Sequence, residues 1–185
     1  GSEMCIRDSG VTVPILILGA SGEEAVEDLI NFDITPSVFT YEFAKALSYE
    51  AERKEKVTKI HIKIDTGMSR IGFLAGENNE EIVDEIIKIS KLPYIEIEGI
   101  FSHFATSDEY DKSYTLLQYG RFMDVCNRLE EKGLNIPIKH ICNSAGIMMY
   151  PEMHLDMVRP GVILYGMYPS CLLYTSPSPR DPKTS

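Results

Sequence analysis

The stretch IHIKIDTGMSRIG, residues 60–72, is the part of the sequence that decides the fold. Its first half alternates Ile60, Ile62 and Ile64 with polar residues, which is the period of a β-strand, and Thr66 and Gly67 end that strand. Other strand-like runs lie at residues 13–18, 37–40, 95–101, 136–142 and 157–165. Helical spacing of apolar residues fills most of the intervals, at residues 23–30, 41–53, 79–91 and 113–132.

This alternation of strands and helices predicts an α/β fold with a parallel sheet. A doubly wound sheet and a (β/α)8 barrel both fit the pattern. No GxGxxG follows the first strand, which weakens the doubly wound dinucleotide fold. Polar clusters follow one strand after another, and barrel active sites lie at the carboxyl ends of strands. The barrel is therefore favoured by the clusters at residues 65–67, 102–103, 143–144 and 159–161.

Composition excludes several classes of protein. The chain has 185 residues and a net charge of -10, which argues against a nucleic-acid-binding domain. Its longest apolar runs are far shorter than the ~20 residues of a membrane-spanning helix, so no membrane partner is expected. Four cysteines without a CxxC spacing predict neither a zinc site nor any other metal site.

The two ends of the sequence look foreign to the rest. Residues 1–9 have no strand or helix periodicity, and residues 171–185 are rich in Ser, Pro and Thr. Codons can be chosen for residues 1–9 whose reverse complement encodes residues 171–178, which resembles a transposon-end sequencing adapter at both ends of an assembled fragment. We therefore expect a non-native head at 1–9, a natural domain at 10–170 and a non-native tail at 171–185. Only Cys126 and Cys142 then remain, and a reduced cytoplasmic state is the simpler expectation.

The block at residues 60–72 also carries candidate chemistry. Lys63 and Asp65 point to the same face of a strand. A lysine that faces a barrel interior is costly unless its charge is paired or removed. Gly67 allows a turn that could bring Arg70 back over the strand end. The alternative is an ordinary ion pair between Lys63 and Asp65.

Together with SHFAT at 102–106, NSA at 143–145 and DMVRPGVILYG at 156–166, this block resembles the pyridoxal-phosphate-dependent alanine racemases of the fold-type III barrel family. The four motifs come in the order of that family, and the resemblance covers essentially all of residues 10–170. The resemblance implies a partial (β/α)8 barrel, roughly strands three to eight. Strand one, with the Schiff-base lysine, and the C-terminal β domain would lie outside this chain.

The resemblance also implies roles for residues of the site. Lys63 would be carbamylated and would hold Arg70, and Arg70 would reach the phenolic oxygen of the cofactor and the substrate carboxylate. Arg159 would face the pyridine nitrogen, and His103 would hydrogen-bond and orient Arg159. The alternatives are a surface ion pair between Asp156 and Arg159 and a structural role for His103. The cofactor phosphate would be held by Asn143 and Ser144, which could also cap a helix, and by the backbone of Gly161 and Val162. No role is implied for His61, His140 or His154.

The implied function is that of a complete parent enzyme. It would interconvert L-alanine and D-alanine through an external aldimine with pyridoxal phosphate, as a cytoplasmic homodimer that supplies D-alanine for peptidoglycan. Its two bases, the Schiff-base lysine and a tyrosine of the partner subunit, would lie outside this chain, so the fragment is expected to be inactive. Alternatives are a racemase for serine or another small amino acid, a non-catalytic pyridoxal-phosphate carrier, and an unrelated barrel that only binds phosphate.

Overall fold

The computed structural model describes residues 2–170 and the side chains from Cys5 onward. The predicted tail at 171–185, with Cys171, lies outside the described residues. Within them, the predicted α/β class and the parallel sheet are confirmed, because every strand pairing is parallel. Strands are present at five of the six predicted places, and two further short strands, at residues 34–35 and 73–74, were not predicted.

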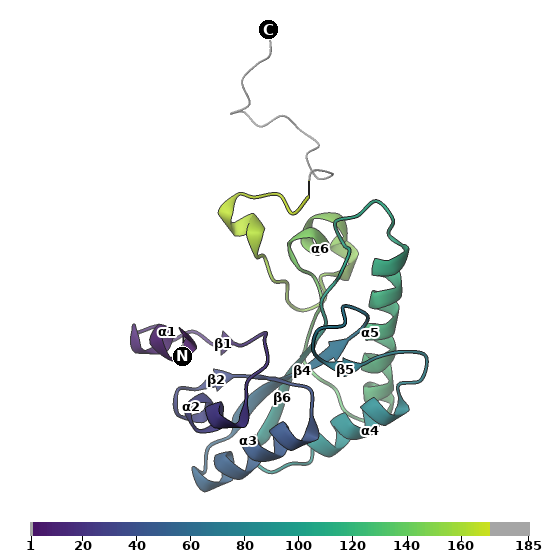
Figure 1. The fold of residues 1–185 in the computed structure, drawn as a ribbon. Helices are drawn as coiled ribbons and strands as arrows, with labels where there is room; N and C mark the ends of the chain where they lie inside the picture. The colour runs from purple at the N-terminus through teal and green to yellow at the C-terminus, as the bar shows by residue number, and fades with distance from the viewer. Residues whose placement is uncertain (1, 171–185) are drawn as a thin grey trace.

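The sheet follows the order of the chain, as the wall of a barrel does (Figure 1). Strands β3, β4, β6 and β7 lie side by side, β5 pairs with β4, and β1 pairs with β2. β2 lies next to β4 through the hydrogen bond from the His61 amide to the Pro36 carbonyl, which follows β2 directly. The strands are β1 (Ile15–Leu16), β2 (Ile34–Thr35), β3 (Ser37–Val38), β4 (Thr58–Asp65), β5 (Phe73–Leu74), β6 (Ile95–Phe101) and β7 (Ile138–His140).

The helices pack in chain order, α2 on α3, α3 on α4 and α4 on α5, from the left of Figure 1 along the bottom to the right. Their apolar faces meet the sheet through Leu47, Ile86 and Phe122, which are fully buried. The helices are α1 (Ser2–Asp8), α2 (Val26–Asn31), α3 (Tyr41–Arg53), α4 (Glu80–Ile89), α5 (Ser113–Glu131) and α6 (Ser144–Met149), with 3-10 turns η1 (Glu23–Ala25), η2 (Pro151–Met153) and η3 (Val162–Tyr165).

Strand β4 is buried on both faces. Ile60, Ile62 and Ile64 pack into the main apolar core. The alternate residues His61, Lys63 and Asp65 are also buried, with at most 5% of their surface exposed. The inner face of this wall is therefore polar, and the outer face packs against the helices.

The prediction of a strand at residues 157–165 is wrong. Residues 162–165 form the 3-10 turn η3, and residues 157–161 have no regular structure. Two ladder-like hydrogen bonds remain, from the amides of Asp156 and Arg159 to the carbonyls of Lys139 and Cys142. This segment lies at the edge of the described sheet, where no second strand extends its hydrogen-bonding pattern.

The first residues also differ from expectation, because residues 2–8 form helix α1. The guanidinium of Arg7 holds this helix against the body by donating to the carbonyls of Val11, Val13, Phe32 and Asp33. These four contacts join a half-buried side chain to backbone carbonyls, a kind of contact that the periodicity of nine residues does not reveal. The origin of residues 1–9 stays a prediction.

The turn after β4 is built from one carboxylate and two glycines. Asp65 accepts hydrogen bonds from the amides of Gly67, Ser69 and Arg70, at 2.9 to 3.0 Å. Gly72 has a φ of +131°, and a Cβ there would lie 2.5 Å from the Asp65 nitrogen. The chain can therefore return alongside β4 as β5 only with glycine at this position.

Gly72→Ala is expected to destabilise the protein by about 1–3 kcal/mol, because it combines a positive φ with a backbone clash. The matched control is Gly76→Ala, where a Cβ meets nothing within 4 Å. That change should stay within about 0.5 kcal/mol of the wild type. Urea unfolding measures both, and equal midpoints for the two variants would contradict the argument.

Candidate active site

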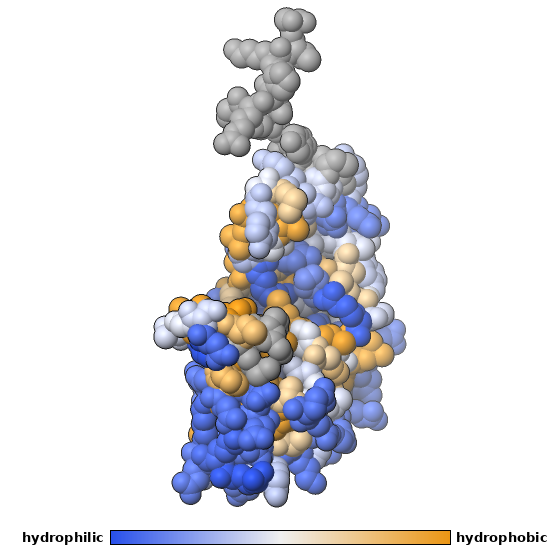
Figure 2. All heavy atoms as spheres, turned by 60° about the vertical axis from the view of Figure 1, so that its left-hand side comes forward, coloured by the Kyte–Doolittle hydropathy of each residue, from blue (hydrophilic) through white to orange (hydrophobic). Residues whose placement is uncertain are grey.

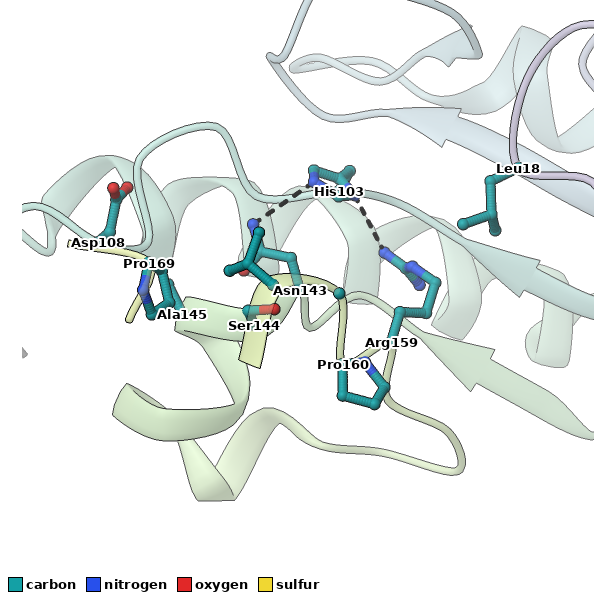
Figure 3. Close-up of a pocket in the computed structure, with 11 residues that line it drawn as sticks. Leu18, His103, Asp108, Asn143, Ser144, Ala145, Arg159, Pro160 and Pro169 are labelled. Carbon is teal, nitrogen blue, oxygen red and sulfur yellow. Dashed lines mark hydrogen bonds between the residues drawn. The ribbon is translucent and has the colours of Figure 1, made fainter. Parts of the chain in front are cut away.

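A hollow of about 580 Å³ opens where the carboxyl ends of β6 and β7 meet the segment that follows residue 158. Figure 3 shows side chains from these three places, together with Leu18, turned toward one space. Six of the residues predicted for the site line this hollow. They therefore lie close together, whatever the role of each. They are His103, Asn143, Ser144, Arg159, Gly161 and Val162.

Arg159 is held by acceptors on two strands. Its Nη2 donates to the carbonyls of Ser102, at 2.6 Å, and Ile141, at 3.1 Å. Its Nη1 donates to Nδ1 of His140, and its Cζ lies 5.3 Å from the centre of the Phe101 ring. Burial lowers the pKa of Arg159 to about 10, so the guanidinium stays protonated at neutral pH. No ion pair to a carboxylate is formed by Arg159 in residues 2–170.

One nitrogen of Arg159 is left over. Nε is buried and has no hydrogen-bond partner, although burying an N–H without an acceptor is costly. Arginine has donors only, so the missing partner must be an acceptor. A residue that lines the hollow and carries an unpaired donor is suited to bind a ligand atom with a lone pair.

His103 lies between two donors. Its Nδ1 is 3.4 Å from Nη2 of Arg159, and its Nε2 is 3.5 Å from Nδ2 of Asn143 (dashed lines in Figure 3). Burial, with the charge of Arg159 next, lowers the pKa of His103 to about 4, so the ring is neutral. A neutral imidazole has one lone pair and can accept from only one of these neighbours.

Asn143 caps helix α6, as one of the alternatives proposed. Its Oδ1 accepts from the Gly146 amide and from the Ser107 hydroxyl, each at 2.9 Å, and its Nδ2 donates to the Phe104 carbonyl. The protein itself therefore uses the oxygen and one of the two N–H groups of this amide. Ser144, the first residue of the helix, stands beside Gly161, where a Cβ would lie 3.6 Å from the Ser144 Oγ.

The second predicted cluster is arranged differently from the expectation. Lys63 is 3% exposed, donates to the Ile64 carbonyl at 2.7 Å and lies over the Phe101 ring. It makes no ion pair with Asp65 in the described chain, because the Asp65 oxygens accept from backbone amides. The pKa of Lys63 is lowered to about 8, chiefly by burial; the charge of Asp65 opposes this shift, and the charges of Arg159 and Arg70 add to it.

Arg70 does not line the hollow. It is exposed in the turn after β4, and its side chain makes no hydrogen bond or ion pair in the described chain. Two neighbouring cations repel each other, so an unmodified Lys63 gives the guanidinium of Arg70 no reason to fold back. The predicted contact between these two side chains is absent with Lys63 as the free amine.

The sequence reasoning missed two histidines. His140, which had no assigned role, is the direct partner of Arg159, and His61 contacts His140 in turn. The period of β4 offered a signal, because His61 lies two residues before Lys63 and therefore on the same inner face. No comparable signal exists for His140, whose partner is 19 residues away. Residues 2–170 contain no group of three or more His, Cys, Asp or Glu side chains arranged to hold a metal ion.

Residues 4–169 match the family described as "Alanine racemase, N-terminal domain". A protein named alanine racemase from Clostridium tetani (strain Massachusetts / E88) is 52% identical over 165 residues, 89% of this chain and 42% of that protein. The structure described as alanine racemase of Clostridium difficile 630 in complex with cycloserine superposes with a TM-score of 0.89 at 45% identity, covering 93% of this chain and 46% of that one.

A histidine racemase from Leuconostoc mesenteroides subsp. sake has the same fold, with a TM-score of 0.80, 27% identity, and coverage of 90% of this chain and 43% of that one. The chain spans less than half the length of these relatives. The prediction of a partial barrel from this family is confirmed. Of the helices in the described chain, none has the length and apolar character needed to cross a membrane.

Proposed function

Because this chain belongs to the alanine racemase family, we propose that the full-length protein is a pyridoxal-phosphate-dependent enzyme that interconverts L-alanine and D-alanine. The observation that carries the proposal is Arg159, a buried guanidinium on the hollow that, among the described residues, has one unpaired donor and no carboxylate partner. The enzyme would act in the cytoplasm and supply D-alanine for peptidoglycan.

The residues present fit pyridoxal phosphate. Nε of Arg159 would donate to the pyridine nitrogen, which removes the cost of the unpaired buried N–H. Ser144, Asn143 at the start of α6, and the backbone of Gly161 and Val162 would hold the phosphate through amide and hydroxyl donors. When bound, the cofactor supplies an electron sink that weakens the Cα–H bond of an amino acid.

Arg159 would set the strength of that sink. With its pKa near 10, Arg159 keeps its proton at neutral pH, so it can donate to the pyridine nitrogen but does not protonate it. An unprotonated ring withdraws electrons less strongly, which limits side transamination. His103 would orient the guanidinium from the side of the hollow.

Racemisation needs one base on each face of the α-carbon. We propose that these are a lysine and a partner-subunit tyrosine outside this chain, so that the active species is a homodimer of the full-length protein. The hydrophobic side chains of Leu164 and Tyr165, which are 73% and 80% exposed, support further covering structure at this edge. Figure 2 shows a patch of hydrophobic atoms at the left of the upper part of this view, with hydrophilic atoms beside it, and mostly hydrophilic atoms at the lower left.

The identity of the substrate is the part of the proposal for which there is a second candidate. A relative with the same fold is named a histidine racemase, so the barrel alone does not restrict the substrate to alanine. A racemase for serine or another amino acid is the second candidate.

The full-length protein with pyridoxal phosphate is expected to racemise alanine faster than serine or histidine, and the 185-residue chain alone should racemise none of them. Circular dichroism or a chiral amine assay measures each rate from both enantiomers. Turnover by the isolated chain would contradict the placement of both bases outside it. A preference for serine or histidine would favour the rival.

Arg159→Glu in the full-length protein should lower racemisation and raise side transamination, because a carboxylic acid can protonate the pyridine nitrogen. Removing a hydrogen bond to a charged group predicts a fall of at least about tenfold in the racemisation rate. Pyruvate formed per racemisation event measures the partition. Arg53→Glu, an exposed change on α3, is the charge-matched control, and an unchanged partition in Arg159→Glu would refute the assignment.

Lys63 is expected to carry a carbon dioxide adduct that turns it into an anion and draws Arg70 toward it. The neutral amine is the reactive form, and burial, by lowering the pKa of Lys63 to about 8, makes that form available near neutral pH. Native mass spectrometry with peptide mapping, with and without bicarbonate, detects the adduct. Lys59, whose pKa is raised by its contact with Glu98, is the internal control. Full activity without an adduct on Lys63 would remove this role.

A further inference from the structure

A line of polar side chains connects Arg159 with the carboxylate of Glu98 on β6. Nδ1 of His140 accepts from Arg159, Nε2 of His140 lies 3.0 Å from Nδ1 of His61, and Nε2 of His61 lies 3.5 Å from Oε2 of Glu98. The other oxygen of Glu98 is held by Lys59 at 2.6 Å. His61 and His140 are 3% and 0% exposed, so water does not compete for these contacts.

The hydrogens in this line can be placed in only one way. Arg159 has donors only, so Nδ1 of His140 must be a lone pair and the hydrogen of neutral His140 is on Nε2. Nδ1 of His61 must then accept it, which leaves the hydrogen of His61 on Nε2. That hydrogen faces the carboxylate of Glu98, which only accepts when ionised.

Both rings are neutral, as this arrangement requires. Burial, followed by the charge of Arg159, lowers the pKa of His140 to about 2. Burial also lowers the pKa of His61, although Glu98 opposes the shift. The charged groups around the pair are Lys63 and Lys59 besides Arg159 and Glu98.

The sheet is shaped to hold the two rings. The register between β4 and β6 shifts between Ile60 and His61, which re-aims the side chain at this point. A Cβ on Gly99 would lie 2.4 to 2.7 Å from ring atoms of His61, so the ring occupies the space that any other residue would fill. The His140 ring stacks on Phe101 with centres 4.7 Å apart.

We propose that His61 and Glu98 are positioning residues, which fix the tautomer of His140 and thereby hold Arg159 with its Nε free for a ligand. Without the acceptor on His61, His140 could place its hydrogen on Nδ1, where it would face the N–H of Arg159. The tautomers depend on contacts within this chain. Only the effect on the reaction rests on the proposed function.

Neutron diffraction from deuterium-exchanged crystals of the full-length holoenzyme reads the tautomers directly. We expect deuterium on Nε2 and none on Nδ1 in both His61 and His140. Deuterium on Nδ1 of either ring would overturn the proposal. This result is informative even if the protein racemises no amino acid, which keeps it separate from a failure of the proposed function.

Two variants test the consequence for Arg159 in the same holoenzyme. His61→Phe keeps a ring but removes the acceptor, and pyruvate formed per racemisation event should rise about tenfold, as for one lost hydrogen bond in a line that ends on a charged group. His61→Asn can place its side-chain oxygen near the former Nδ1, and it should restore most of the wild-type partition. A wild-type partition in His61→Phe, or an equal defect in His61→Asn, would overturn the proposal.

A glycine pair gives the same test without changing the histidine. Gly99→Ala should push the His61 ring away and shift the partition in the direction of His61→Phe. Gly120→Ala, where a Cβ meets nothing within 4 Å, should leave it unchanged. An unchanged partition in a folded Gly99→Ala protein would count against the proposal, and the neutron map decides the matter if the variants do not fold.

Discussion

The rest of the site depends on a guanidinium that is buried without a carboxylate. Taking a charge out of water is costly, and an ion pair is the usual compensation. Arg159 instead donates hydrogen bonds to the backbone carbonyls of Ser102 and Ile141 and to the lone pair on Nδ1 of His140. Both carbonyls belong to residues at the carboxyl ends of parallel strands. The backbone of the sheet therefore keeps the positive charge in place. The charge is therefore held but not neutralised, and it remains available to act on a ligand through Nε.

A second cation, Lys63, lies on the same inner face as Arg159, and the two positive charges repel each other. Lys63 and Arg159 both lie over the Phe101 ring, and the charge of Arg159 helps to lower the pKa of Lys63. Lys63 can lose its proton, whereas Arg159 cannot. Of these two cations, Arg159 therefore stays charged, whereas the charge of Lys63 can change. Converting Lys63 to an anion would turn repulsion of Arg70 into attraction, which is why the position of Arg70 and the state of Lys63 have to be considered together.

The sequence predicted those parts of the structure that depend on local periodicity. Helix α3 (Tyr41–Arg53) and strand β6 (Ile95–Phe101) begin and end where the pattern placed them. The strand expected at 157–165 failed because pairing at a sheet edge depends on a neighbour and not on the segment's own residues. The motifs brought His103, Asn143, Ser144 and Arg159 to one hollow. They did not reveal His140, because its role is a contact with a residue from another segment, or the outward position of Arg70, which lies in an exposed turn after β4.

The two histidines beside Arg159 are constrained in opposite ways. His140 is completely enclosed, with its hydrogen placed by His61 on one side and its lone pair used by Arg159 on the other. His103 faces donors from both Arg159 and Asn143, so one of its nitrogens keeps a hydrogen for which the described side chains offer no acceptor. The contact of the guanidinium with His140, on the side of the sheet, is thus fixed, whereas its contact with His103, on the side of the hollow, can change. An acceptor that enters the hollow and takes the hydrogen on Nε2 of His103 would leave Nδ1 to accept from Arg159, so the second side of the guanidinium would be fixed only when such an acceptor is present.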